Sequence, residues 1–129
     1  MKPYKILIVE DDRQLAEMLK MSFDLKQFAA KICYDGLEAL NEISRERPDM
    51  IILDVMLPGI DGWEVMARLK ANTKTSGIPV IICTARDGLQ DVEKSFSSGA
   101  QSYVAKPIDF DKLLKKVAVI LNIETLLSE

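Results

Sequence analysis

Polar side chains that could do chemistry together stand at the ends of short apolar runs in this sequence. Asp54 lies in the run MIILDV, Thr84 closes the run PVIICT, and Lys106 follows SYVA. The first run, KILIV, is followed by three consecutive acids, Glu10, Asp11 and Asp12. An ionised carboxylate gains nothing from apolar neighbours, so Asp54 needs either a structural partner or a chemical role.

Five apolar segments predict the strands of a parallel sheet. Four of them are near-continuous runs of aliphatic and β-branched residues, which is the pattern of strands covered on both faces. The fifth is weaker because it carries Lys31, and it is predicted to be an edge strand. In chain order, the predicted strands cover residues 5–10, 28–34, 50–55, 79–84 and 102–107.

Apolar residues at helical spacing follow each of these strands. Asp61 and Asp109 are predicted to start the third and fifth helices. Strand-helix units that repeat about every 20 residues predict an α/β fold. We expect a doubly wound, five-stranded parallel sheet with five helices, a flavodoxin-like architecture with right-handed crossovers. The predicted apolar stripes are Leu15, Met18, Leu19 and Phe23; Leu37, Leu40 and Ile43; Val65, Met66 and Leu69; Val92 and Phe96; and Leu113, Leu114, Val117, Ile120 and Leu121.

The carboxyl ends of the strands are the predicted location of a site, because open parallel sheets bind ligands where their strand order reverses. With the order 2-1-3-4-5, the strand of Asp54 lies between the strand followed by the acids and the strand of Thr84. Neighbouring strands are about 4.8 Å apart, so these side chains would share one small site. Carboxylates about 5 Å apart repel by about 3 kcal/mol per pair at an effective dielectric of about 20, so a cation is needed. Oxygen ligands alone select a hard divalent ion, Mg²⁺ first, with Mn²⁺ or Ca²⁺ as alternatives.

Aspartyl-phosphate chemistry fits this set of side chains. Asp54 would act as the nucleophile toward a phosphoryl group. Lys106 would neutralise charge on the phosphoryl oxygens, and the hydroxyl of Thr84 would donate a hydrogen bond to one of them. A purely structural interpretation stays open for the acids, since Asp11 and Asp12 could simply cap the first helix.

The same residues carry a resemblance to a known family. The motifs LIVEDD, ILDVMLPGIDG, TA at 84–85 and KP at 106–107, in this order and spacing, closely resemble the receiver domain of two-component response regulators, the CheY-like superfamily. The resemblance runs from Lys5 to about Leu121. We therefore expect one receiver domain over residues 3–122, followed by a C-terminal tail or helix extension over 123–129.

The resemblance implies a phosphoacceptor and a metal site. Asp54 would receive a phosphoryl group from a phosphohistidine on a sensor histidine kinase or a histidine phosphotransfer protein. Asp11, Asp12 and Asp54 would hold Mg²⁺, with Asp12 and Asp54 in direct contact and Asp11 acting largely through water. The backbone carbonyl of Met56 would complete the protein ligands.

The resemblance also implies a switch. The hydroxyl of Thr84 would move toward the phosphoryl group, and the ring of Tyr103 would turn inward, although plain core filling by Tyr103 stays open. The peptide bond between Lys106 and Pro107 is expected to be cis. The output surface, where a downstream effector, an output domain outside this chain or a second copy would bind, is expected on the fourth helix, the fifth strand and the fifth helix. Met56 and Arg86, two places after Asp54 and Thr84, are predicted to tune the lifetime of the acyl phosphate.

Composition narrows the function classes. The chain has 129 residues and no histidine, which excludes histidine-based triads and zinc sites within it. Its formal charge is -3 and it has no lysine or arginine block, so direct nucleic-acid binding is not expected. No apolar run is long enough to span a bilayer, and the N-terminus does not read as a signal peptide, so we expect a cytoplasmic protein. Cys33 and Cys83 are predicted to be buried free thiols.

Three other functions compete with a self-phosphorylating signalling module that turns over no external metabolite. An aspartyl-nucleophile phosphohydrolase of the haloacid-dehalogenase type would need a second acid two residues after the nucleophile, where Met56 stands. A flavodoxin-like FMN binder would need a phosphate loop after the first strand, where the sequence is acidic. A non-phosphorylated interaction module would have no reason to keep Asp54, Thr84 and Lys106 together.

Overall fold

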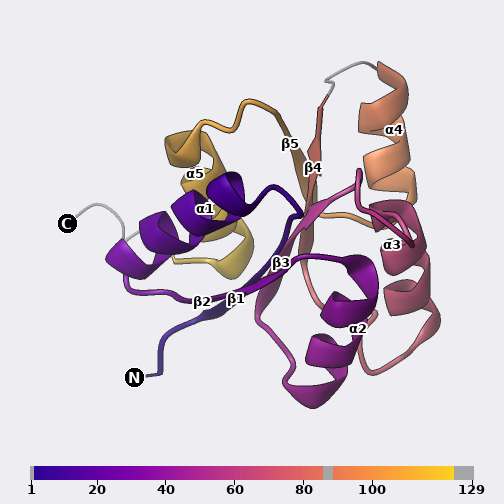
Figure 1. The fold of residues 1–129 in the computed structure, drawn as a ribbon, viewed down its shortest axis with the longest axis horizontal. Helices are drawn as coiled ribbons and strands as arrows, with labels where there is room; N and C mark the ends of the chain where they lie inside the picture. Colours follow the sequence, from indigo (N-terminus) through magenta and orange to yellow (C-terminus); the bar gives the residue numbers. More distant parts are fainter. Residues whose placement is uncertain (1, 86–88, 124–129) are drawn as a thin grey trace.

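A single five-stranded parallel sheet forms the centre of the molecule in this computed structural model, which describes residues 2–85 and 89–123. The strand order is β2-β1-β3-β4-β5. Helices α1 and α5 cover one face of the sheet, and α2, α3 and α4 cover the other (Figure 1). The predicted fold class and strand order are confirmed. The strands are β1 (Lys5–Val9), β2 (Ala29–Cys33), β3 (Met50–Asp54), β4 (Val80–Thr84) and β5 (Ser102–Ala105), and the helices are α1 (Arg13–Leu25), α2 (Gly36–Arg45), α3 (Gly62–Ala71), α4 (Leu89–Ser97) and α5 (Phe110–Leu121).

The central strands are apolar throughout because they are covered twice. Every residue of β3 and of β4 is buried. Successive side chains of a strand point to opposite faces, so Ile51 and Leu53 pack toward α2 and α3, whereas Met50 and Ile52 pack toward α1 and α5. The first four residues of the edge strand β2 alternate between exposed and half-buried, and only Cys33 at its end is buried, in line with its weaker pattern.

Aspartates start four of the helices. Asp12, Asp35, Asp61 and Asp109 each accept a hydrogen bond from the backbone N–H three residues on, which satisfies one otherwise unpaired donor in the first turn. The predicted starts at Asp61 and Asp109 are confirmed.

Three residues of the predicted apolar stripes do not face the core. Met18 is 63% exposed, Leu37 56% and Phe96 52%. In α1 the buried residues are Ala16, Leu19 and Phe23, and Met18 lies on the opposite side of the helix. The stripe in the sequence was misassigned because small residues, which hydropathy patterns weight lightly, occupy the tightest contacts with the sheet.

The end of α5 is defined by Asn122, which adopts a left-handed conformation with φ 59° and stops the helix at Leu121. Ile123 is buried against the core. Ile123 is the first residue of the predicted tail, 123–129, and residues 124–129 lie outside the described residues. Among the helices described, none combines the length and apolarity needed to cross a membrane. Cys33 and Cys83 are buried free thiols, as predicted.

Candidate functional site

Side chains from the ends of three strands meet at the carboxyl edge of the sheet. Glu10, Asp11 and Asp54 each present a carboxylate oxygen within 4.8 Å of the others. Strand register explains the meeting: Val9 pairs with Leu53, so one further residue along β1 brings Glu10 level with Asp54 on β3. Glu10 and Asp54 are 2% and 3% exposed, whereas Asp11 is exposed.

Lys106 joins two of these carboxylates from β5. Its Nζ lies 2.8 Å from Oε1 of Glu10 and 3.1 Å from Oδ2 of Asp54. The side chain of Lys106 is 25% exposed, so the ammonium is partly screened from water while its partners are almost fully buried. The peptide bond that follows it, to Pro107, is cis, as the resemblance implied.

The cluster contains more carboxylates than ammonium groups, and this imbalance shifts the pKa values of its members. Burial raises the pKa of Glu10 from 4.5 to about 7, although the hydrogen bonds from Lys106 and the backbone of Asp12 act against that rise. Burial alone would lower the pKa of Lys106, but its hydrogen bonds to Glu10 and Asp54 outweigh burial and raise it. One ammonium therefore serves two buried carboxylates, and a second cation at this edge would relieve the remaining repulsion.

Asp12, expected as a direct metal ligand, lies outside this group of three carboxylates. Its side chain accepts a hydrogen bond from the backbone N–H of Leu15 at 3.2 Å and caps α1, and its own backbone N–H donates to Glu10 at 3.1 Å. Glu10, for which no metal role was predicted, lies beside Asp54 instead. The signal for this was in the sequence, because Glu10 directly continues the apolar run of the first strand.

Met56 and Thr84 lie where the sequence placed them, at the same edge. The backbone N–H of Met56 donates to Oδ1 of Asp54 at 3.0 Å, and the Met56 side chain is 70% exposed. Thr84 is buried at the end of β4, in register with Ala105, and its carbonyl accepts from the N–H of Lys106 at 2.8 Å. Arg86, predicted to flank the site, lies outside the described residues.

Tyr103 lies further from the edge, in register with Ile82 of β4. Its ring is half-buried against the core on the α2, α3 and α4 face. It packs edge-on against Phe96 of α4 with ring centroids 6.0 Å apart, and Nζ of Lys116 of α5 lies 5.7 Å from its centroid. The tyrosine therefore connects α4, β5 and α5.

The start of α3 is packed directly against the backbone that carries Asp54. The N–H of Gly62 donates to the carbonyl of Val55 at 3.0 Å. A Cβ atom at Gly62 would lie 2.5 Å from the carbonyl oxygen of Asp54 and 2.6 Å from Cα of Val55. Backbone atoms cannot rotate away, so this position requires glycine for close approach.

Gly62→Ala is therefore expected to destabilise the domain by about 1–3 kcal/mol, because α3 must move away from β3 to admit the methyl group. Urea unfolding measures the change. Gly77→Ala is the matched control, since the nearest atom to a Cβ there is Nη2 of Arg47 at 3.7 Å. Equal stabilities of the two variants would contradict the close packing of Gly62.

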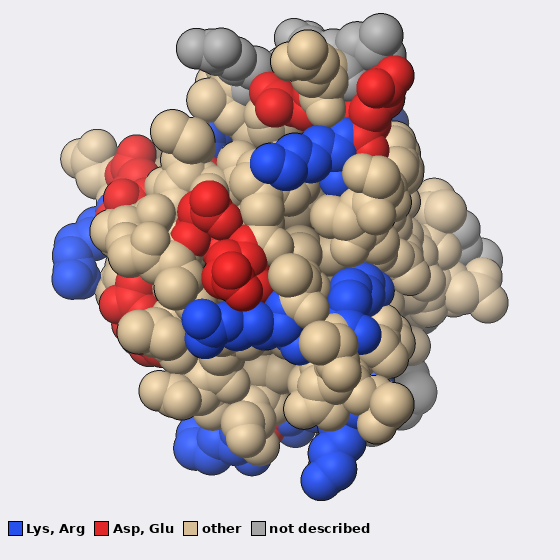
Figure 2. Space-filling view, turned by 90° about the vertical axis from the view of Figure 1, so that its right-hand side faces the viewer, with Lys and Arg blue, Asp and Glu red and all other residues tan. Residues whose placement is uncertain are grey.

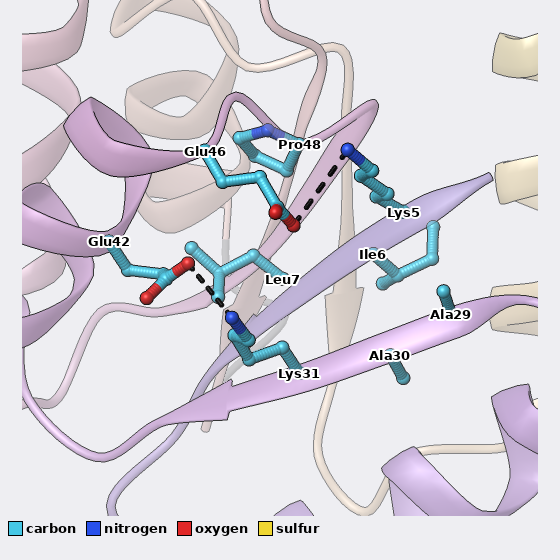
Figure 3. Close-up of a pocket in the computed structure, with 9 residues that line it drawn as sticks. All are labelled: Lys5, Ile6, Leu7, Ala29, Ala30, Lys31, Glu42, Glu46 and Pro48. Carbon is cyan, nitrogen blue, oxygen red and sulfur yellow. Dashed lines mark hydrogen bonds and ion pairs between the residues drawn. The ribbon is translucent and has the colours of Figure 1, made fainter.

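A hollow of about 140 Å³ lies at the other end of the sheet and is unrelated to this cluster. Figure 3 shows it between α2 and the first residues of β1 and β2, where Lys5 pairs with Glu46 at 3.8 Å and Lys31 with Glu42 at 3.0 Å. The face formed by α2, α3 and α4 carries basic and acidic side chains side by side, with no broad area of one sign (Figure 2). That face therefore has no continuous basic surface that could bind the phosphate backbone of a nucleic acid.

The chemistry available at the carboxyl edge follows from the donor set. Three carboxylates within reach of one another and no nitrogen or sulfur ligand among them suit a hard divalent ion. Asp54 is also a buried carboxylate held between a backbone N–H donor and an ammonium. The arrangement is suited to binding an anionic group against Asp54 and neutralising its charge.

Comparisons with known proteins agree with this geometry. The family model described as the response regulator receiver domain matches residues 6–118. The curated response regulator MprA from Mycobacterium sp. (strain KMS) is 35% identical over 120 residues, which are 93% of this chain and 51% of that protein. MprA from Mycobacterium avium (strain 104) is 35% identical over 118 residues, 92% of this chain and 51% of that protein. The chain thus spans about half the length of the curated relatives it matches.

Solved structures give the same result. A chain from Chloroflexus aurantiacus J-10-fl that is ascribed to the response regulators superimposes with a TM-score of 0.89 at 36% identity, covering 94% of this chain and 99% of that one. The receiver domain of the Francisella response regulator 1452 superimposes with a TM-score of 0.85 at 30% identity, covering 90% and 94%. Sequence and fold agree over almost the whole chain, and this protein belongs to the response regulator receiver domain family of two-component systems.

Proposed function

We propose that the chain is a phosphorylation-controlled switch in which Asp54 accepts a phosphoryl group from a phosphohistidine. The observation that supports it most is the contact of Lys106 with both Asp54 and Glu10, because it places an ammonium beside a buried nucleophile in a cluster of acids. The phosphohistidine belongs to a sensor kinase or phosphotransfer protein, since this chain contains no histidine.

The transfer step requires little of the protein beyond positioning and charge neutralisation. A carboxylate oxygen of Asp54 attacks phosphorus, the O–P bond forms as the N–P bond of the donor breaks, and the leaving nitrogen keeps the electron pair. Lys106 neutralises charge on the phosphoryl oxygens, and the hydroxyl of Thr84 donates to one of them. Water later hydrolyses the acyl phosphate, so the chain turns over no external metabolite.

We propose that Glu10, Asp11 and Asp54, with the backbone carbonyl of Met56, hold Mg²⁺ or Mn²⁺ at this edge. In this proposal Glu10 is a metal ligand in place of Asp12, because the carboxylate of Asp12 caps α1 and lies outside the group of three carboxylates. The ion supplies charge neutralisation for the incoming phosphoryl group. A phosphohydrolase would need an acid where Met56 stands, and the exposed thioether there cannot move a proton.

The output of the switch is proposed to pass through Thr84 and Tyr103 to the face made by α4, β5 and α5. When the hydroxyl of Thr84 moves to the phosphoryl group, the ring of Tyr103 turns inward and the contacts it makes with Phe96 and Lys116 are lost. A downstream partner, an output domain or a second copy that prefers the rearranged face then shifts the population.

Acetyl phosphate, a small phosphodonor, tests the proposal without knowledge of the kinase. Incubation with acetyl phosphate and MgCl₂ should add the mass of one phosphoryl group to the intact chain, and omission of MgCl₂ should prevent the addition. An unchanged mass under both conditions would overturn the proposed function.

Mg²⁺ is expected to stabilise the fold more at about pH 8 than at about pH 6. Burial raises the pKa of Glu10 to about 7, so in the absence of metal the fold favours the protonated carboxyl. This contribution to the free energy of unfolding is fully present below the ordinary pKa of 4.5 and is lost as the pH rises through about 7. Binding of the ion requires the ionised carboxylate and offsets that loss. The measurement is the increase in Tm on adding saturating MgCl₂ at the two pH values. Glu10→Gln should remove most of the pH dependence; an equal increase at both pH values in the unmodified chain would rule out Glu10 as a ligand.

A further inference from the structure

Over the side chains that the structure describes, helix α4 is anchored by fewer buried residues than the helix beside it. Among the side chains of α4 that the structure describes, residues 90–97, only Ser95 is fully buried, and its hydroxyl donates to the carbonyl of Asp91 in the same helix at 2.8 Å. Helix α3 buries Val65, Met66 and Leu69. Most of the free energy that fixes a helix in place comes from its apolar burial, so α4 is easier to displace than α3.

Two aromatic contacts restrain α4 from its neighbours. Nζ of Lys94 lies 4.7 Å from the ring centroid of Trp63, in the first turn of α3. On β5, the ring of Tyr103 receives the edge of Phe96 at 6.0 Å with an interplanar angle of 89°. Phe96 and Lys94 are both exposed, so these contacts hold the helix at its surface and not through the core.

The backbone directly before Trp63 is fixed against the end of β3. Trp63 follows Gly62, which packs against the carbonyl of Asp54 so closely that no side chain fits between them. The indole itself is half-buried and packs against the core on this face of the sheet. Lys94 of α4 therefore contacts Trp63, whose backbone position is set by the packing of Gly62 against Asp54.

We propose that the contact between Lys94 and Trp63 sets the equilibrium between two positions of α4, and that both are positioning residues for the phosphorylation switch. The inference rests on the proposed function, in which Tyr103 turns inward and Phe96 loses its aromatic partner. Of the two aromatic contacts described for α4, the one between Lys94 and Trp63 then remains.

The direction of the effect follows from the state in which the contact is observed. The contact is observed together with the packing of Tyr103 against Phe96, which the proposed function assigns to the unphosphorylated arrangement, so it stabilises that arrangement. A cation over a tryptophan ring at an exposed site shifts an equilibrium by about 2- to 5-fold. Weakening the contact therefore favours the phosphorylated arrangement by the same factor, since the coupling between the contact and the site is reciprocal.

Lys94→Met tests this inference, because it keeps an unbranched side chain and removes only the charge. Trp63 is the single tryptophan of the chain, so its emission reports movement of α4 against the start of α3, with or without the charge of residue 94. The protein is titrated with beryllium fluoride, a phosphoryl mimic, at saturating Mg²⁺. Lys94→Met should reach its half-maximal emission change at about 2- to 5-fold lower beryllium fluoride than the unmodified chain. Lys94→Arg should restore the original midpoint, and Lys26→Met, which removes an exposed charge at the end of α1, should leave it unchanged.

Each remaining outcome decides against the inference. It is overturned if Trp63 emission does not respond in a chain that acetyl phosphate phosphorylates, or if the midpoint of Lys94→Met equals that of Lys26→Met. It is also overturned if Lys94→Arg behaves like Lys94→Met, since the loss would then not be one of charge. A chain that accepts no phosphoryl group from acetyl phosphate overturns the proposed function first, and this restraint with it.

Discussion

Asp54→Asn is expected to abolish phosphorylation while leaving the fold intact. The amide has no carboxylate oxygen to attack phosphorus, so the loss should be complete and not partial. The amide oxygen can still accept from the N–H of Met56, and Lys106 keeps its pairing with Glu10 at 2.8 Å, so only the contact between Lys106 and Oδ2 of Asp54 is lost. Intact mass after incubation with acetyl phosphate and MgCl₂ measures the effect.

The same substitution should change the response to metal. Without Asp54 only two of the three clustered carboxylates remain, so the rise in Tm on adding MgCl₂ should fall sharply. Asp111→Asn is the matched control, because Asp111 is an exposed acid in the first turn of α5. Uptake of a phosphoryl group by Asp54→Asn, at a rate near that of the control, would place the acceptor elsewhere in the chain.

Lys106→Met should slow phosphorylation by acetyl phosphate by about 100-fold or more, since a preorganised cationic donor to a developing phosphoryl charge is removed. The substitution also leaves Glu10 and Asp54 buried without their ammonium. In the absence of metal this should destabilise the fold by about 3 kcal/mol, and saturating Mg²⁺ should recover part of that loss by replacing the missing cation. Phosphorylation rates and urea unfolding with and without MgCl₂ measure the two effects.

Lys106→Arg separates charge from geometry. The guanidinium retains the positive charge, so it should recover most of the stability in metal-free conditions, but its planar fork cannot occupy the position of a compact ammonium between two carboxylates. Phosphorylation should therefore stay slow. If Lys106→Met phosphorylates at the unmodified rate, Lys106 has only a structural role at this edge.

The position of the acidic cluster shows which contacts could be predicted from the sequence and which depend on strand register. Asp54 and Lys106 were correctly placed together because β3 and β5 end at the same edge of a parallel sheet. The choice between Glu10 and Asp12 required the register of β1 on β3, which pairs Val9 with Leu53 and so brings Glu10 level with Asp54. Two residues later, Asp12 is the N-cap of α1, and its carboxylate accepts a hydrogen bond from the backbone N–H of Leu15.

The helix faces show the same division. The apolar stripe of α3 was predicted correctly because its buried residues are large. The stripe of α1 was misassigned at Met18, since the residues nearest the sheet include the small Ala16, and apolar type alone does not tell a core residue from an exposed one. The weak anchoring of α4 and the contact of Lys94 with Trp63 could not be predicted, because they depend on the distance between helices that are far apart in sequence.

The amino-acid sequence by itself determined the alternation of strands and helices and the edge of the sheet to which the reactive side chains belong. These follow from local periodicity and from the handedness of parallel crossovers, which act over short segments. Only the tertiary structure decided which acids meet, which ammonium they share and how firmly each helix is anchored. Those outcomes depend on register and packing, where a shift of a single residue exchanges one carboxylate for another.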